Sequence, residues 1–358
     1  MDTITHGILG AAISQSVLMR RLPRGAGLIG ALAAMAPDLD IFIRSSTDPT
    51  VGWVFHRHFT HSLIFIPIGG LIAALPFLWA GRYRDHKLPV ILASMIAYAS
   101  HGQLDSLTNY GTQLLWPFSD YRVAWDSIGI VDPIYSIILL IGVVLAARTG
   151  RIRPARIAFV VSSLYLCFGG WQHFRALEVQ KQLIAERNQQ AQHVRVMPAM
   201  GWLIYWHSVY LADGRLYADG VRTPWFRRSQ ILEGGSTDAV TFEDLPPAAQ
   251  SNPEARRRFQ ILYWFGDRLL GAIPDQPVMA GMADMAGAAP AVGDMRITAS
   301  VEGLTPLWGL QFDSTSGAAE RWNPPPTNRR HFGDLIRGLF LGDPRYKELK
   351  SNSYNAAP

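Results

Sequence analysis

Residues 88–107 read LPVILASMIAYASHGQLDSL, an apolar run that carries two ionisable side chains near its end. A helix that crosses a membrane needs about 20 predominantly apolar residues, and this run has that length. His101 and Asp105 are four residues apart, so they share one helix face. A carboxylate inside a membrane helix costs about 2.5–3.5 kcal/mol and needs a partner. The pair can bind one cation together, or Asp105 can orient the imidazole by accepting its hydrogen bond.

Five more apolar segments accompany this one in the first half of the chain. The 358 residues are 49% hydrophobic and 17% charged, against about 25% charged residues in a typical soluble domain. The deficit lies between Met1 and Gly170, where Lys87 is the single lysine and glutamate does not occur. These features predict a mainly α fold, in which a polytopic helical membrane domain precedes a smaller α+β extramembrane domain. The six predicted spans are 3–19, 25–43, 61–80, 88–107, 129–147 and 155–173.

The second half has the composition of an ordinary globular domain. Trp202–Leu211 and Arg215–Val221 resemble strands, and the Ala-Asp-Gly between them is typical of a hairpin turn. The last residues have little capacity to form a core, so we expect a disordered tail. The predicted domains are 1–173 for the membrane part, 174–198 for a helical extension, 199–340 for the α+β domain and 341–358 for the tail.

Basic residues are concentrated in alternate loops of the first half. The loops 20–24, 81–87 and 148–156 are basic, whereas 44–60 and 108–128 carry few basic residues. Cytoplasmic loops are enriched in Lys and Arg, so six spans would leave the C-terminal domain outside the cytoplasm. We therefore predict a multi-pass protein of the inner (cytoplasmic) membrane, with the lipid bilayer as its partner. Despite a net charge of +5, this loop pattern is not a groove-binding surface, and no nucleic acid partner is predicted.

This topology brings most histidines and aspartates of the first half to one membrane face. Carboxylates at that depth need a cation, so the pattern as a whole predicts a metal site at the extracytoplasmic face. Some members have other interpretations. Asp132 before Pro133 is typical of a helix N-cap, and His58 is as readily solvated. Arg57 can bind an anionic group such as phosphate, or it can lie among lipid headgroups.

The available ligand types indicate which cation the site would take. Nitrogen and oxygen ligands without a thiolate suit zinc, with manganese or iron as alternatives. The number of His and Asp residues is large for one ion, so two ions bridged by a carboxylate are a further alternative. The chain has no phosphate-binding glycine loop or dinucleotide fingerprint, so no organic cofactor is predicted. A hydrolase that acts through metal-activated water is the first functional hypothesis.

Four short motifs carry a family resemblance. They are Thr5-His6 with Gly10, Pro37-Asp38-Leu39-Asp40, His56-Arg57 with Thr60-His61-Ser62, and His101-Gly102 with Asp105. Together they resemble a bacterial inner-membrane family of metal-dependent hydrolases whose name includes LexA binding, over roughly residues 1–170. The resemblance implies the metal ligands His6, Asp38, Asp40, His56, His61, His101 and Asp105.

A His-x-x-x-Asp pair within a helical, His/Asp-rich cluster is also similar to the zinc-dependent phospholipase C type of site. That similarity implies phosphoester substrates, lipid headgroups among them. We therefore predict a membrane-embedded metal-dependent hydrolase of an ester or phosphoester, with a small-molecule or lipid substrate and with Arg57 and Asp105 as catalytic residues. The alternatives are a non-catalytic metal-binding membrane protein, a transporter or a stress-associated scaffold.

Overall fold

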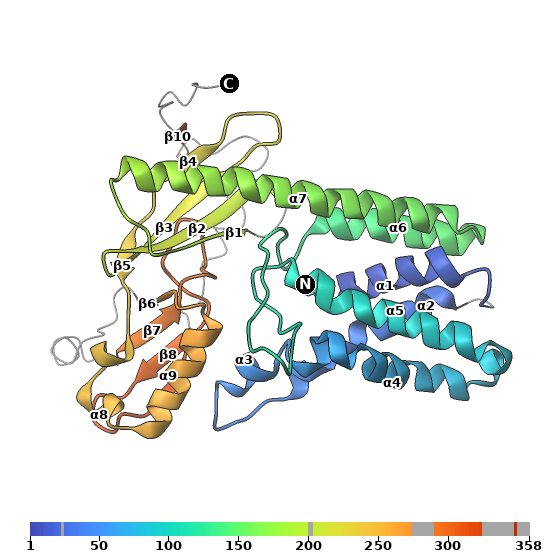
Figure 1. Ribbon diagram of the computed structural model, residues 1–358, viewed down its shortest axis with the longest axis horizontal. Coiled ribbons are helices and arrows are strands. Elements are labelled where there is room, and N and C mark those ends of the chain that lie inside the picture. Colours follow the sequence, from blue (N-terminus) through green and yellow to red (C-terminus); the bar gives the residue numbers. More distant parts are fainter. Residues whose placement is uncertain (23–24, 200–202, 274–289, 324–346, 349–358) are drawn as a thin grey trace. The chain divides into compact units, whose positions relative to one another are not determined.

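The computed structural model describes residues 1–22, 25–199, 203–273, 290–323 and 347–348 (Figure 1). Two compact units divide the chain, the first comprising Met1–Trp171 and the second beginning at Gln172. The first unit is helical and the second contains the strands. Helix α7 (Arg153–Glu186) contributes residues to both units.

Aspartates start two helices of the first unit. The Asp2 carboxylate accepts a hydrogen bond from the backbone N–H of Thr5 at 3.0 Å and caps α1. The Asp132 carboxylate accepts one from the N–H of Tyr135 at 3.0 Å, which confirms its predicted N-cap role at α6. The elements before α7 are α1 (Thr3–Leu18), α2 (Ala26–Met35), η1 (Ala36–Phe42), α3 (Val51–Phe55), η2 (Phe59–His61), η3 (Leu63–Phe65), α4 (Ile66–Trp79), η4 (Gly81–His86), α5 (Lys87–Ser106) and α6 (Pro133–Thr149).

Helices α1 and α2 cross at small residues. A Cβ atom added to Gly10 would collide with the carbonyl oxygen of Gly30 and with the Ala34 side chain. Small residues of this kind let two helix backbones approach closely. The crossing positions the functional site, because His6 lies one turn before Gly10 and the segment with Asp38 follows α2 directly.

The prediction of a polytopic helical membrane domain is wrong. Among the described residues, α7 alone is a single helix long and apolar enough to cross a membrane. The pieces Val51–His61 and Leu63–Trp79, bent by 55° relative to each other, would form a second span if the pair is taken as one broken helix. The protein is about 51% helical and 16% strand. Three predicted spans are too short as helices, since α1 has 16 residues, α2 has 10 and α6 has 17, against the requirement of about 20. The multi-pass topology that relied on six spans is not supported.

Antiparallel sheets form the strand-containing part of the second unit. One sheet has the order β1-β2-β3-β4-β10, with β5 also paired to β3, and the other has the order β6-β7-β8-β9. The strands are β1 (His193–Pro198), β2 (Tyr205–Ala212), β3 (Arg215–Arg222), β4 (Gln230–Leu232), β5 (Ser236–Asp238), β6 (Leu270–Ala272), β7 (Ala291–Asp294), β8 (Gly309–Phe312), β9 (Ala319–Trp322) and β10 (Lys347–Glu348). The helices are η5 (Phe242–Asp244), α8 (Pro247–Gln250) and α9 (Pro253–Phe265), and Figure 1 shows α9 beside the second sheet.

The β2–β3 hairpin confirms the turn predicted from Ala-Asp-Gly. Asp213 and Gly214 have φ angles of 51° and 72°, the left-handed conformation that a two-residue hairpin turn requires. Within the predicted segment 174–198, α7 ends at Glu186 and β1 begins at His193. The predicted tail 341–358 lies outside the described residues except for 347–348, so its disorder stays a prediction, as do the domain boundaries.

Candidate metal centre

Four buried side chains direct one ligand atom each toward a common point. Asp38 comes from η1, His61 from the end of η2, and His101 and Asp105 from α5, and their ligand atoms all lie within 4.8 Å of one another. His101 Nε2 lies 3.3 Å from Asp38 Oδ1 and 3.4 Å from Asp105 Oδ2. His61 Nε2 lies 3.7 Å and 3.3 Å from the same two oxygens.

Hydrogen bonds on the far side of each imidazole fix its tautomer. His101 Nδ1 lies 2.5 Å from the carbonyl oxygen of Ala34, which can only accept, so this nitrogen carries the proton. His61 Nδ1 lies 2.9 Å from the Thr60 hydroxyl, which itself donates to Asp40, and 3.2 Å from the Asp40 carboxylate, so this nitrogen also carries a proton. Nε2 of each ring therefore faces the centre, where its lone pair can bind a cation. This backing of a ligating imidazole by a carbonyl or carboxylate is usual at metal sites.

The atoms that face the centre have no hydrogen-bond partner. His61 Nε2, His101 Nε2 and Asp105 Oδ2 are all buried and unsatisfied. A buried polar atom without a partner is costly, and lone pairs that face one another repel. Tetrahedral coordination with metal–ligand bonds of about 2.1 Å separates the ligand atoms by about 3.4 Å, close to the spacing of 3.3–3.7 Å described above. A divalent cation fits this arrangement.

The charge of the cluster points to the same conclusion. Burial raises the pKa of Asp38, but its close contacts with the His101 and His61 rings outweigh burial and hold that pKa well below its usual range. Burial likewise raises the pKa of Asp105, but the charges of Arg57, the Met1 amine and His6 together outweigh burial and hold that pKa well below its usual value, so this carboxyl is also ionised. Asp38, Asp40 and Asp105 carry three negative charges against the one positive charge of Arg57. Although burial lowers the pKa of His61, the carboxylates of Asp105, Asp38 and Asp40 raise it to about 10, so without a metal this ring holds a proton. A bound cation would displace that proton, and two negative charges would then remain, which a divalent cation balances.

Asp40 supports the site from outside rather than facing its centre. Besides His61, it receives a hydrogen bond from the Thr60 hydroxyl at 2.8 Å and one from the Arg57 backbone N–H at 3.0 Å. Its other oxygen lies 2.8 Å from His56 Nδ1. Asp40 and His56, both predicted as ligands, are thus one contact removed from the four converging atoms. Their arrangement orients His61.

His6 and the chain's first residue converge on Asp105. The His6 ring stacks on the His101 ring with centroids 3.6 Å apart, and its Nε2 lies 3.0 Å from Asp105 Oδ1. The Met1 amine donates a hydrogen bond to the same oxygen. Burial, aided by the Arg57 charge, lowers the pKa of this amine to about 6. Burial also holds the pKa of His6 well below its usual value, so both groups are neutral at pH 7.

Arg57 lies at the edge of the centre in a strained backbone conformation. Its φ is 65°, which a bulky residue rarely adopts. The side chain is buried, and Nη1 donates to the Thr108 hydroxyl at 2.8 Å. Nε lies 3.1 Å from Asp105 Oδ2 without forming a hydrogen bond. Backbone strain of this kind tends to occur at functional sites.

Sequence patterns alone did not predict every residue that contacts the centre. Thr3 donates a hydrogen bond to Asp38 Oδ2 at 2.5 Å, and nothing in its local sequence distinguishes it from other threonines. His58 lies apart from the four atoms, against Trp116 with ring centroids 5.3 Å apart. The described residues form one group of three or more converging ligand atoms, so the two-ion alternative finds no second group there.

Comparison with known proteins finds relatives for the helical part of the chain. Residues 1–176 match the family model described as YdjM inner membrane protein. Over 122 residues the chain is 32% identical to the "Inner membrane protein YbcI" of Escherichia coli (strain K12), which is 33% of this chain and 69% of that protein. This chain belongs to the YdjM inner membrane protein family. No solved structure matches it.

The residues that match the family include the whole His/Asp cluster. The converging residues Asp38, His61, His101 and Asp105 all lie within the matched region. The YdjM family name and that of the relative are both those of inner-membrane proteins. The chain is therefore an inner-membrane protein with a buried His/Asp cluster that can bind a divalent cation.

Proposed function

We propose that this member of the YdjM family is a metal-dependent hydrolase of an ester or phosphoester. The observation that carries the proposal is Arg57, a buried guanidinium whose Nε has no hydrogen-bond partner and lies 3.1 Å from Asp105 Oδ2. The guanidinium is paired in charge with Asp105, but this N–H makes no hydrogen bond and so remains able to donate to a substrate oxygen. A hydrolase needs such a donor, because negative charge develops on the substrate in the transition state.

In this reaction each residue of the centre would have a separate role. A zinc, manganese or iron ion would supply Lewis acidity and a water of lowered pKa. Asp38, His61 and His101 would hold the ion, and Asp40 would keep His61 in the required tautomer. Arg57 would donate to the anionic oxygen of the substrate. Asp105, which contacts both His101 and Arg57, would exchange one of these contacts to admit the substrate and accept a proton.

A second function, stabilisation of the fold by the metal alone, is favoured by a different observation. Structural metal sites are closed by four protein ligands, whereas catalytic sites keep an open position. Here four protein atoms converge, and three of the four side chains have no exposed surface. In this case the ion would tie η1, η2 and α5 together and would have no substrate.

Hydrolysis by the full chain in lipid nanodiscs tests the two functions. Nitrophenyl esters, a nitrophenyl phosphodiester and phospholipids serve as substrates, with H101Q and R57Q as variants and H58Q as the matched control. A hydrolase loses its metal and its activity in H101Q, keeps its metal but loses about 100-fold or more in kcat in R57Q, and is unaffected in H58Q. A metal-loaded protein that hydrolyses none of these substrates would overturn the enzyme proposal in favour of the structural one.

We further propose that the residues after α7 lie outside the cytoplasm. Arg148 at the end of α6, Arg151 between the two helices and Arg153 at the start of α7 precede the apolar part of α7, and cytoplasmic flanks are enriched in such residues. A periplasm-dependent phosphatase reporter fused after residue 200 should be active in cells. An inactive reporter there, with an active cytoplasmic reporter at the same position, would reverse the orientation.

A further inference from the structure

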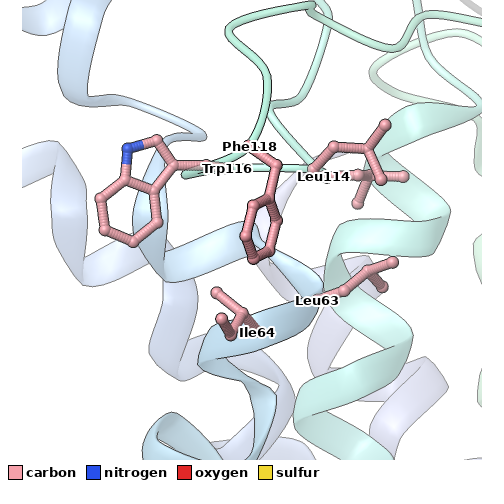
Figure 2. A pocket seen from close by; sticks show the side chains of 6 residues that line it. Leu63, Ile64, Leu114, Trp116 and Phe118 are labelled. Atoms are coloured by element: carbon pink, nitrogen blue, oxygen red, sulfur yellow. The ribbon is translucent and has the colours of Figure 1, made fainter.

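An apolar pocket is lined by residues that begin with Leu63, two residues after His61 in the chain. Its volume is about 350 Å³, at the lower end of the range for small-molecule sites. Two segments supply its walls, and Figure 2 shows their side chains facing one another. The lining consists of Leu63, Ile64, Leu114, Leu115, Trp116 and Phe118, with no charged side chain among them.

Backbone contacts tie this pocket to the metal centre. The N–H of Leu63 donates to the Leu114 carbonyl at 3.0 Å, and that of Gln113 donates to the Arg57 carbonyl at 3.0 Å. The Leu114 side chain also approaches Gly102, the residue after the ligand His101, and a Cβ there would lie 3.2 Å from it. The segment that forms one pocket wall therefore also borders Arg57 and both histidine ligands.

The pocket lies at a break between helices. Val51–His61 and Leu63–Trp79 together have the length and apolar character of a span, but they are bent by 55°. The metal ligand His61 ends the first piece, and the pocket residue Leu63 begins the second. Broken backbone at membrane depth is tolerated where it lines a cavity. The break thus places a polar centre and an apolar cavity next to each other.

The outer rim of the pocket continues into an apolar surface. Leu63 and Ile64 are 44% and 49% exposed, and Phe118 is 83% exposed. On α4 the exposed residues Ile68 and Leu71 extend this surface. A soluble ligand would leave these side chains in water, whereas a bilayer covers them. In an inner-membrane protein the most abundant apolar ligand that can reach such an opening is a lipid acyl chain.

We propose that this pocket holds the acyl chain of a lipid ester, whose scissile group then reaches the metal centre and Arg57. Binding of the acyl chain is inferred from the pocket alone. Delivery of the scissile group to the metal centre rests on the proposed hydrolase function. It narrows the substrate from any ester or phosphoester to one that carries an aliphatic chain.

The binding half can be tested without catalysis. The full chain is placed in nanodiscs that contain a phosphatidylcholine with a brominated acyl chain, which quenches tryptophan fluorescence on contact. The difference between the wild type and W116F isolates the quenching of Trp116. I64Q makes the pocket wall polar, and I68Q is the matched control, since Ile68 is 54% exposed on the same apolar surface. We expect I64Q to weaken the quenching of Trp116 about tenfold and I68Q to leave it unchanged.

The catalytic half uses nitrophenyl esters from acetyl to decanoyl on the same proteins. We expect kcat/KM to rise with chain length in the wild type and in I68Q, and to become independent of chain length in I64Q with its metal content unchanged. Hydrolysis without any dependence on chain length would overturn the pocket proposal and leave the hydrolase standing. Quenching lost in I64Q, without hydrolysis of any ester, would support the pocket and overturn the enzyme.

Two further outcomes would also overturn the pocket proposal. Equal effects of I64Q and I68Q on quenching would mean that lipid merely surrounds this surface. A change of oligomeric mass in I64Q, with quenching unaltered, would mean that a second copy of the chain covers the pocket. Circular dichroism of each variant checks that it is folded.

Discussion

Replacing Asp38 by Asn should largely abolish the loss of stability that metal removal causes. The substitution keeps the shape of the side chain and removes one of the three buried negative charges. The Thr3 hydroxyl can still donate to the amide oxygen, as it does to Asp38 Oδ2. The amide nitrogen can then donate to the lone pair of His101 Nε2, 3.3 Å from the present Oδ1. D38N therefore satisfies an atom that the metal-free wild type leaves without a partner.

The magnitude follows from the repulsion between Asp38 and Asp105. Their ligand oxygens lie within 4.8 Å, and two like charges at that separation repel by about 3.5 kcal/mol at an effective dielectric constant of about 20. In the metal-free protein the proton on His61 offsets this repulsion, since Asp38 and Asp105 both raise the pKa of that ring. Metal-free D38N should thus differ in stability from the metal-free wild type by less than about 3.5 kcal/mol. Loss of an oriented ligand should weaken metal binding by about 100-fold or more, since removal of a supporting contact alone costs about 10–100-fold.

The assay is unfolding of the full chain with and without a chelator, together with elemental analysis of bound metal. The wild type should carry one divalent ion and lose stability on chelation. D38N should carry little metal and respond weakly to the chelator. D48N is the control, because Asp48 accepts hydrogen bonds from its neighbour Thr50 and is not one of the four converging residues. Wild-type metal content in D38N, or a wild type indifferent to the chelator, would refute the charge argument.

Three other substitutions or conditions test separate parts of the structure. D40N should weaken metal binding about 10–100-fold without removing a converging atom, measured by competition with a chromogenic chelator; an unchanged affinity would mean that Asp40 does not orient His61. Metal content should fall as the pH is lowered from about 7 to 5, because protons compete for the imidazole lone pairs, and retention of metal at pH 5 would contradict histidine ligation. G10A should destabilise the α1–α2 crossing by about 1–3 kcal/mol in denaturant unfolding, whereas G52A, with open space around its Cβ position, should not; equal effects would contradict the close approach.

Local sequence was sufficient where a few neighbouring residues fix the conformation. Asp132 before Pro133 specifies a helix start, because a carboxylate in that position accepts from the first free N–H groups and proline has none to lose. Asp213-Gly214 specifies a hairpin, because these residues tolerate positive φ. The concentration of His and Asp in an apolar half likewise indicated a metal site, since buried carboxylates need a counter-charge.

Tertiary structure decided what depends on where helices break and cross. Apolar composition alone did not reveal that α1 and α2 end after 16 and 10 residues or that the chain bends between His61 and Leu63, and for these reasons the six-span prediction was wrong. Nor did the sequence separate the four converging residues from Asp40, His56 and His6, which have the same chemistry and lie in the same motifs. Whether a carboxylate faces the centre or backs a histidine depends on which atoms it meets within about 3 Å. The crossing of α1 with α2 and the turn after α2 set those distances.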